Sequence, residues 1–178
     1  MSEPTTDNLH RFISLDHSFR VVAAVNTEVV REACLRHNIT GLAAVALGRA
    51  LTAAQLMATL GKNEERITIQ IRGSGPLRGI VVDAWSNGGA RGYVTEPVQV
   101  TPPEGRIWLY KLVGRQGTVT VQRDVGLKDI YQGTRELVQG EVDEDIEGYL
   151  RNSEQIPSAL GCDVILDEAA GQSHVKTR

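Results

Sequence analysis

The stretch 41–61, GLAAVALGRALTAAQLMATLG, constrains the fold of this chain more than any other part of the sequence. It is apolar on nearly every face of a helix and is long enough to suggest a membrane span. Arg49 and Gln55 lie inside it, however, and an arginine in the middle of a bilayer is costly. We therefore predict a helix over 42–60, ended by Gly61, that lies at the centre of the domain and is covered on several sides.

Shorter elements are expected on both sides of this helix. Before it, the pattern predicts a strand over 19–25 and, after an N-cap at Asn26 or Thr27, an amphipathic helix over 27–37. After it, isoleucines alternate with polar residues at 67–72, a period of two that is typical of a strand. Further strands are indicated at 79–85, 91–96, 106–113, 118–124, 131–138 and 162–166, and a further helix with an acidic first turn at 141–150.

This order of elements predicts an α+β fold. Antiparallel β-hairpins and sheets are expected to pack around a buried central helix, with further helices before and after it. A length of 178 residues suits one domain. We assign residues 1–168 to that domain and expect 169–178 to be frayed.

Charge, cysteine content and the start of the sequence limit which partners, cofactors and cellular location we expect. A net charge of -3 argues against nucleic acid, which usually requires a basic face. The start MSEPTTDNLHRFI has no basic residues followed by an apolar run, so we expect no secretory signal, no membrane partner and a cytoplasmic location. Cys34 and Cys162 are far apart and belong to no CxxC or Cys/His cluster, so neither a metal site nor another cofactor is predicted.

A glycine-rich loop, GSGPLRG at 73–79, raises the question of phosphate binding. A dinucleotide-binding loop requires G-x-G-x-x-G followed by a helix, and here the last glycine comes one place too late. The sequence that follows, GIVVDAW, is rich in β-branched residues and typical of a strand. We therefore interpret the loop as the turn of a β-hairpin.

No catalytic constellation emerges from the sequence. The histidines lie outside any recognised catalytic motif. Ser153 and Glu154 in SEQIPS are candidates for a carboxylate site, although capping and turn chemistry before a proline also explains them. We therefore expect a binding protein rather than an enzyme. A hydrolase with a cleft at Ser153 and Glu154, or a domain that pairs with one defined partner, stays as an alternative.

Five blocks of the sequence occur in the order found in one protein family. They are DNLHR, ALGRALTAAQLMATLGKNEERITIQIRGSGPLRGIVVDA, GARGYV, VTVQRDVGLKDIYQG and EDIEGYLRNSEQIPSAL. Together they resemble the 33 kDa heat-shock chaperones, also called 33 kDa chaperonins, over residues from about Asp7 to about Leu166. The resemblance implies an ATP-independent holdase that binds unfolding proteins during heat or oxidative stress, prevents their aggregation and forms a homodimer.

The resemblance also implies a redox switch that this sequence does not contain. In full-length relatives a linker and a small zinc domain follow the core, and four cysteines spaced as CxC and CxxC hold the zinc. Cys34 and Cys162 match neither motif. The chain therefore resembles the N-terminal core alone, with 169–178 as the start of the linker, and zinc is expected only in the missing C-terminal domain.

A holdase needs exposed apolar surface and no catalytic residue. Strand residues are the candidates for this surface, although each of them also suits a core. The candidates for client binding are Leu77, Ile80, Val82, Trp85, Trp108 and Tyr110.

Overall fold

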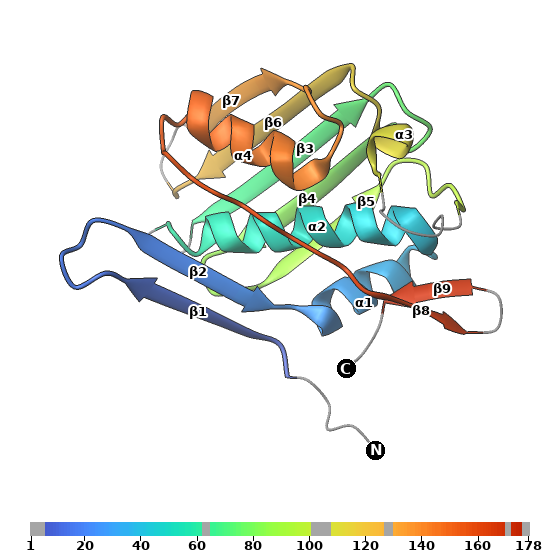
Figure 1. Ribbon diagram of the computed structural model, residues 1–178, viewed down its shortest axis with the longest axis horizontal. Coiled ribbons are helices and arrows are strands. Elements are labelled where there is room, and N and C mark those ends of the chain that lie inside the picture. Colours follow the sequence, from blue (N-terminus) through green and yellow to red (C-terminus); the bar gives the residue numbers. More distant parts are fainter. Residues whose placement is uncertain (1–5, 62–64, 101–107, 127–129, 170–171, 176–178) are drawn as a thin grey trace.

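The structure is a computed structural model that describes residues 6–61, 65–100, 108–126, 130–169 and 172–175. Its centre is helix α2 (Gly41–Ala58), which confirms the predicted central helix. The helix is long and apolar enough to cross a membrane by composition, yet 89% of that window is buried inside the fold. Figure 1 shows why, because the other elements surround α2 on several sides.

A five-stranded antiparallel sheet covers one side of α2. In sequence order its strands are β3 (Arg66–Gly73), β4 (Gly79–Trp85), β5 (Ala90–Val94), β6 (Gly117–Asp124) and β7 (Tyr131–Glu136). In space they lie in the order β5-β4-β3-β6-β7. The predicted alternation holds, since Ile67, Ile69 and Ile71 are buried against the helices while Thr68 and Gln70 point to the other face.

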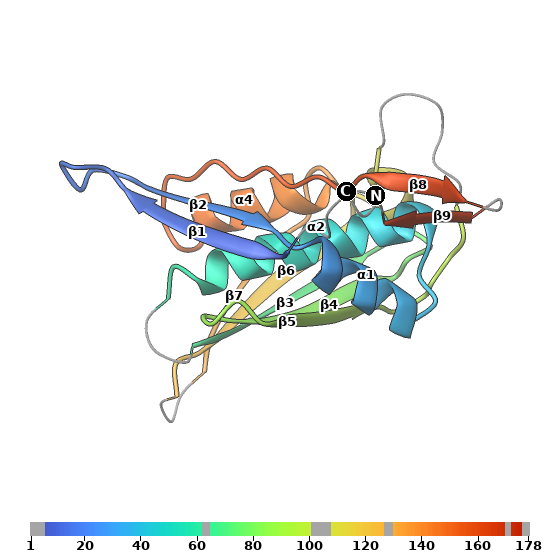
Figure 2. The same ribbon diagram turned by 90° about the horizontal axis from the view of Figure 1, so that it is seen from below.

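Two further helices flank α2 on the same face of the sheet. α1 (Thr27–Arg36) packs against α2 and β5, and α4 (Val142–Asn152) packs against α2 and β6. Figure 2 shows the resulting two layers, with the helices on one side and the sheet on the other. The fold is therefore α+β with a buried central helix, as predicted.

The N-terminal hairpin extends away from these layers. β1 (Asn8–Ile13) pairs with β2 (Arg20–Val25) in an antiparallel two-stranded sheet. Figures 1 and 2 both show it projecting beyond the end of α2. We call residues 8–25 the arm.

The C-terminal part of the chain crosses over α2 before it forms a second small hairpin. Residues 154–165 have no regular secondary structure and run diagonally across α2 in Figure 1. β8 (Leu166–Ala169) then pairs with β9 (Gln172–Val175). The strand expected at 162–166 therefore begins only at its last residue, and residues 172–175, expected to be frayed, form a strand.

The strand expected over 106–113 is wrong where the structure describes it. Tyr110–Val113 form one helical turn, α3, in which Val113 N donates to Leu109 O at 2.9 Å. The turn buries Leu109, Leu112 and Val113 together, because positions three and four apart share one side of a helix. Consequently β6 pairs with β3, which lies earlier in the sequence, rather than with a strand at 106–113. Residues 106 and 107 lie outside the described residues.

The glycine-rich loop is a turn between two paired strands, which confirms the hairpin prediction. β3 and β4 are antiparallel, with Arg72 opposite Gly79. The loop packs against α3, because Gly75 N donates to Val113 O and Leu77 N donates to Leu112 O. A side chain at position 75 would collide with this backbone, since an added Cβ would lie 2.3 Å from Leu112 O.

Candidate binding surface on the arm

Three of the six candidate client-binding residues lie inside the core. Leu77 and Ile80 are each 1% exposed and Val82 is 0% exposed. Ile80 and Val82 are buried because they share the face of β4 that packs on α2, whereas Leu77 is buried beside α3. The expectation that these three offer surface is therefore corrected, since a client cannot touch them while the core is closed.

The three aromatic candidates keep some surface but do not form one patch. Trp85 is half-buried at the end of β4, with the Arg91 guanidinium 5.3 Å from its ring centroid. Trp108 is 43% exposed, and its ring lies edge-on to the ring of Tyr110 at 6.2 Å. Arg115 lies 4.3 Å over Tyr110. Cations therefore occupy part of the surface of Trp85 and of Tyr110, which makes these two rings less suited to binding apolar segments.

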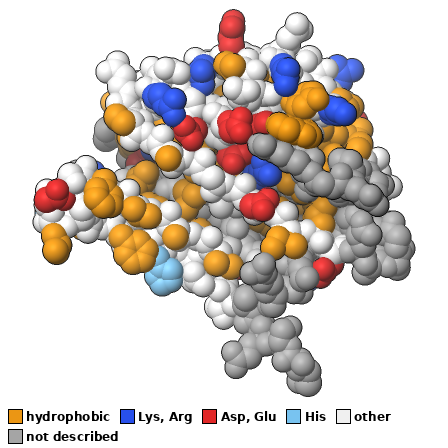
Figure 3. Space-filling model, in the orientation of Figure 1, with side chains coloured by type: hydrophobic (Ala, Val, Ile, Leu, Met, Phe, Trp, Pro, Cys, Tyr) orange, Lys and Arg blue, Asp and Glu red, His pale blue; other side chains and the backbone are white. Residues whose placement is uncertain are grey.

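A group of exposed apolar side chains lies instead on one face of the arm. Opposite residues of β1 and β2 share a face, and Phe12 stands opposite Val21. The same face carries exposed residues from both strands and from the turn, which we call the arm face: His10, Phe12, Phe19, Val21, Ala23 and Val25. Figure 3 shows the hydrophobic side chains gathered on the projecting hairpin, with a histidine beside them.

The arm face is open and carries no Asp, Glu, Lys or Arg side chain. Phe12 is 58% exposed and Phe19 is 61% exposed, which is far more than phenylalanine usually shows in a folded domain. The His10 ring stacks beside Phe12 at 6.2 Å. An apolar face of this kind is typical of an interaction surface.

The opposite face of the arm turns to the body. Val22 and Ala24 are half-buried there, and Arg11 Nη1 donates to Thr59 O at 2.9 Å, just beyond the end of α2. The root of the arm is also tied to α1, because the Asp7 carboxylate accepts hydrogen bonds from Glu28 N and Val29 N, both at 2.9 Å. The arm is thus anchored at its base while its outer face stays open.

The tip of the arm is a turn held by its own side chains. Ser14 N donates to Phe19 O at 3.0 Å, and Asp16 accepts hydrogen bonds from the main chain and hydroxyl of Ser18. Hydrogen bonds from Ser14 and Ser18 lower the pKa of Asp16 to about 2. Leu15 is fully exposed at this tip and extends the apolar surface outward.

Comparison with known proteins places this architecture in a family. The family model of the Hsp33 protein matches residues 7–176. The chain belongs to the Hsp33 family.

Its similarity to other Hsp33 proteins covers nearly the whole chain. The 33 kDa chaperonin of Geobacter sulfurreducens is 43% identical over 92% of this chain and 54% of its own length. That of Synechococcus sp. (strain JA-3-3Ab) is 46% identical over 90% of this chain and 51% of its own length. The crystal structure of the Thermotoga maritima 33 kDa chaperonin superposes with a TM-score of 0.83 at 36% identity, covering 94% of this chain and 57% of that one. The chain therefore spans about half the length of the curated relatives it matches.

The zinc chemistry implied for Hsp33 relatives does not fit the cysteines of this chain. Burial raises the pKa of Cys34, on α1, and of Cys162, in the crossing segment, to about 12 in each case. Zinc binds the thiolate form, which such burial disfavours. Among the described residues, no group of three or more His, Cys, Asp and Glu side chains is arranged to hold a metal ion.

Ser153 and Glu154 are engaged in structural contacts in this Hsp33 chain. The Arg123 guanidinium donates to both carboxylate oxygens of Glu154, at 2.9 and 2.8 Å, and also to Glu65 at 2.8 Å. Ser153 ends α4, with its main-chain N donating to Tyr149 O. A carboxylate that is held by arginine is a poor general base, so these residues give the hydrolase alternative no support.

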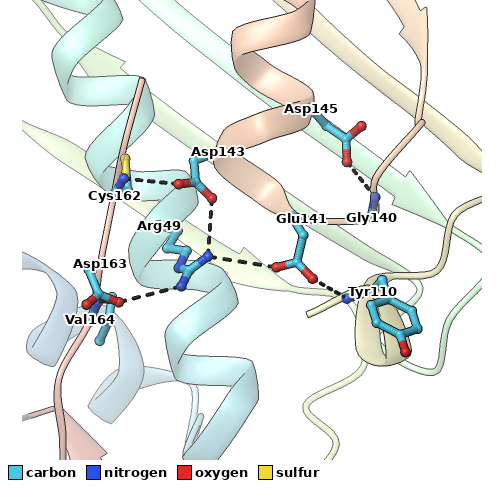
Figure 4. A network of polar contacts seen from close by, with 9 residues as sticks. All are labelled: Arg49, Tyr110, Gly140, Glu141, Asp143, Asp145, Cys162, Asp163 and Val164. Atoms are coloured by element: carbon cyan, nitrogen blue, oxygen red, sulfur yellow. Dashed lines mark hydrogen bonds and ion pairs between the residues drawn. The ribbon is translucent and has the colours of Figure 1, made fainter. Parts of the chain in front are cut away.

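A second ion cluster, centred on the mostly buried Arg49, holds the crossing segment on α2. Figure 4 shows Arg49 of α2 between Asp143 at 3.3 Å, Asp163 at 3.5 Å and Glu141 at 3.8 Å. Asp143 also accepts a hydrogen bond from Cys162 N at 3.1 Å. Arg49, whose charge made a membrane span unfavourable, therefore has a structural role, since it joins α2, α4 and the crossing segment.

Proposed function

We propose that this chain is the client-binding part of a chaperone, an ATP-independent holdase whose clients contact the arm face. Its clients are unfolding proteins, its site of action is the cytoplasm, and it makes and breaks no covalent bond. Homodimer formation belongs to the same proposal. The names of the Hsp33 relatives support the chaperone class, and the open apolar arm face supports the way in which clients are bound.

The observation that carries the proposal is the exposure of both phenylalanines on the arm face. Covering several hundred Å² of apolar surface contributes on the order of 10 kcal/mol before the cost of association. This term depends on area rather than on sequence, so it suits the capture of many different unfolded chains. The charged residues of β1 and β2, Arg11 and Arg20, lie on the other face, which leaves the arm face free for apolar segments.

The experiment compares a variant that loses the phenylalanines of the arm face with a control variant at Ile13, which lies next to Phe12 but on the opposite face. Phe12 and Ile13 are similarly exposed, at 58% and 53%, but point to opposite faces. In light scattering from a heat-unfolding client without ATP, Phe12→Ser combined with Phe19→Ser should weaken client affinity by about tenfold for each phenylalanine removed. Ile13→Ser should hold clients almost as well as the wild type. Equal holding by all three proteins would refute the arm face as the client surface.

A further inference from the structure

We infer that the outer edge of β1 captures extended client segments by strand addition, so that a segment of about six residues becomes a third strand of the arm. This inference rests on the proposed function and specifies the clients as segments in β conformation with apolar side chains at alternate positions. The main chain of β1 would bind any sequence, and the arm face would select apolar side chains.

The hydrogen bonds of the hairpin fix which main-chain groups of β1 point outward. Ser14 N donates to Phe19 O and Phe19 N donates to Ser14 Oγ, so Ser14 and Phe19 form a hydrogen-bonded pair next to the end of the ladder. Because such pairs alternate along an antiparallel ladder, Phe12, His10 and Asn8 also bond to β2. Leu9, Arg11 and Ile13 therefore direct their N–H and C=O groups away from β2.

No other strand of the described residues pairs with that outer edge. Figure 1 shows β2 between β1 and the body, and β2 is the strand of the arm that packs against α2. Within the described part of the chain, β1 pairs with β2 alone, and no main-chain hydrogen bond outside that ladder involves Leu9, Arg11 or Ile13. Each of these groups is a free donor or acceptor for an added strand.

The usual protections of an exposed edge are missing from β1. The sequence NLHRFI has no proline, and its register against β2 runs without a bulge. Its one charged side chain, Arg11, is turned to the body by its hydrogen bond to Thr59 O. A two-stranded hairpin is only marginally stable in water, so a third strand is also favourable for the arm itself.

A second copy of this chain is a poorer occupant of the edge than a client. Two β1 strands related by a two-fold axis must place outward residues opposite outward residues. The longest registers then set Arg11 opposite Arg11, or His10 opposite His10, of the second copy. Neither pairing is complementary, and like charges directly opposite each other destabilise a sheet. A client brings its own sequence and avoids this conflict.

Strand addition predicts an asymmetry that simple apolar contact does not. When the client adds as an antiparallel third strand, the client residues that hydrogen-bond to Leu9, Arg11 and Ile13 have side chains on the face opposite the arm face. Client residues with side chains on the arm face direct their N–H groups away from β1. Blocking the first set of N–H groups should therefore abolish binding, while blocking the second set should be tolerated.

The probe is a peptide that alternates valine and threonine, with lysines at both ends. Binding places the valines on the arm face. N-methylation of the threonines should weaken binding by at least about tenfold, because several main-chain hydrogen bonds are lost. N-methylation of the valines gives a peptide of the same composition and should change affinity by less than about threefold. Equal affinity of the two methylated peptides would overturn the inference.

Two measurements on the protein complete the test. Hydrogen exchange at the amides of Leu9, Arg11 and Ile13 should slow when the unmethylated peptide binds. Ile13→Pro, which removes an outward N–H and no ladder bond, should weaken peptide binding about tenfold, while Ile13→Thr should not.

The outcomes separate strand addition from the proposed function. If the protein still suppresses client aggregation but the amides of Leu9, Arg11 and Ile13 stay unprotected, strand addition is wrong and the proposed function stands. If neither peptide nor client is held, the proposed function fails. If Ile13→Pro instead dissociates a dimer that does not bind the peptide, the edge belongs to a second copy.

Discussion

Val164 packs against the bare backbone of Gly48, so closely that a Cβ added at Gly48 would lie 2.6 Å from Val164 Cγ2. The same added atom would lie 2.9 Å from Val30 Cγ1 of α1. One glycine in the middle of α2 therefore lets both α1 and the crossing segment approach the central helix. Its position inside a helix, where glycine is unfavourable, is explained by this close packing.

Gly48→Ala should destabilise the protein, although alanine is the better helix former. The gain in helix propensity is about 1 kcal/mol, whereas forcing an atom into a packed contact costs typically about 1–3 kcal/mol. We expect a lower midpoint of urea unfolding with an unchanged dependence on urea concentration. Adding Val164→Ala should recover part of the loss, because it removes the nearest clash. A Gly48→Ala protein that is more stable than the wild type would contradict the packing seen here.

Glu141 gives the stability of this protein a defined dependence on pH. Its carboxylate accepts a hydrogen bond from Tyr110 N and faces Arg49, yet burial dominates and raises its pKa above the ordinary 4.5. In the unfolded chain the group loses its proton near pH 4.5. Between that pH and the raised folded value, the unfolded state is deprotonated first, which favours unfolding. The stabilising contribution is thus complete below pH 4.5 and is lost as pH rises through the folded pKa.

The check is Glu141→Gln, which keeps an acceptor for Tyr110 N and cannot ionise. The unfolding free energy of this variant minus that of the wild type should rise as pH increases from about 4.5 and then level off. Denaturant unfolding at a series of pH values measures it. The absolute difference in unfolding free energy also contains the lost ion pair with Arg49, so only the change of this difference with pH tests the effect of burial. A difference that falls with pH would show that attraction to Arg49 outweighs burial.

The sequence predicted those parts of the fold whose local pattern agrees with their burial. α2 was predictable because a helix that is apolar all round has to be surrounded, and β3 because its isoleucines alternate with polar residues. α3 was missed because a single buried turn with β-forming residues looks like a strand when read alone. Its conformation depends on contacts with the glycine loop, which lies far away in the sequence.

The arm face was missed for a different reason. Phe12, Phe19 and Val21 fit a buried strand as well as an exposed one, and only the position of the hairpin outside the body decides between the two. A signal was present in the sequence, because Val21, Val22, Ala23 and Ala24 put apolar residues on both faces of one strand. Two apolar faces on a hairpin indicate either full burial or an interaction surface.

The two thiols should be unreactive in the folded protein. Burial is the main cause that raises the pKa of Cys34 and Cys162 to about 12, so almost no thiolate is present near neutral pH. Iodoacetamide at about pH 8 should label neither cysteine in the native chain and both after unfolding in urea. For the same reason, we expect client holding by this chain to be unchanged by reductant. Rapid native labelling, or holding that vanishes on reduction, would contradict this account.

Asp7 should couple the arm to the body. We predicted Asn26 or Thr27 as the N-cap of α1, and Asn26 does occupy that position, but its side chain makes no capping bond and instead accepts from Thr52 Oγ1. Asp7 supplies the cap from outside the helix, through hydrogen bonds from Glu28 N and Val29 N. Asp7→Ala should therefore destabilise the fold by about 0.5–2 kcal/mol, the usual effect of losing a cap. Asp7→Asn keeps one acceptor oxygen and should therefore lose less stability than Asp7→Ala.

Hydrogen exchange shows whether the effect of Asp7→Ala is confined to the arm. Exchange in β1 and β2 should accelerate more than exchange in α2, since the root of the arm is released while the core stays closed. Equal acceleration in the arm and in α2 would mean that Asp7 stabilises the whole fold and has no particular role at the arm.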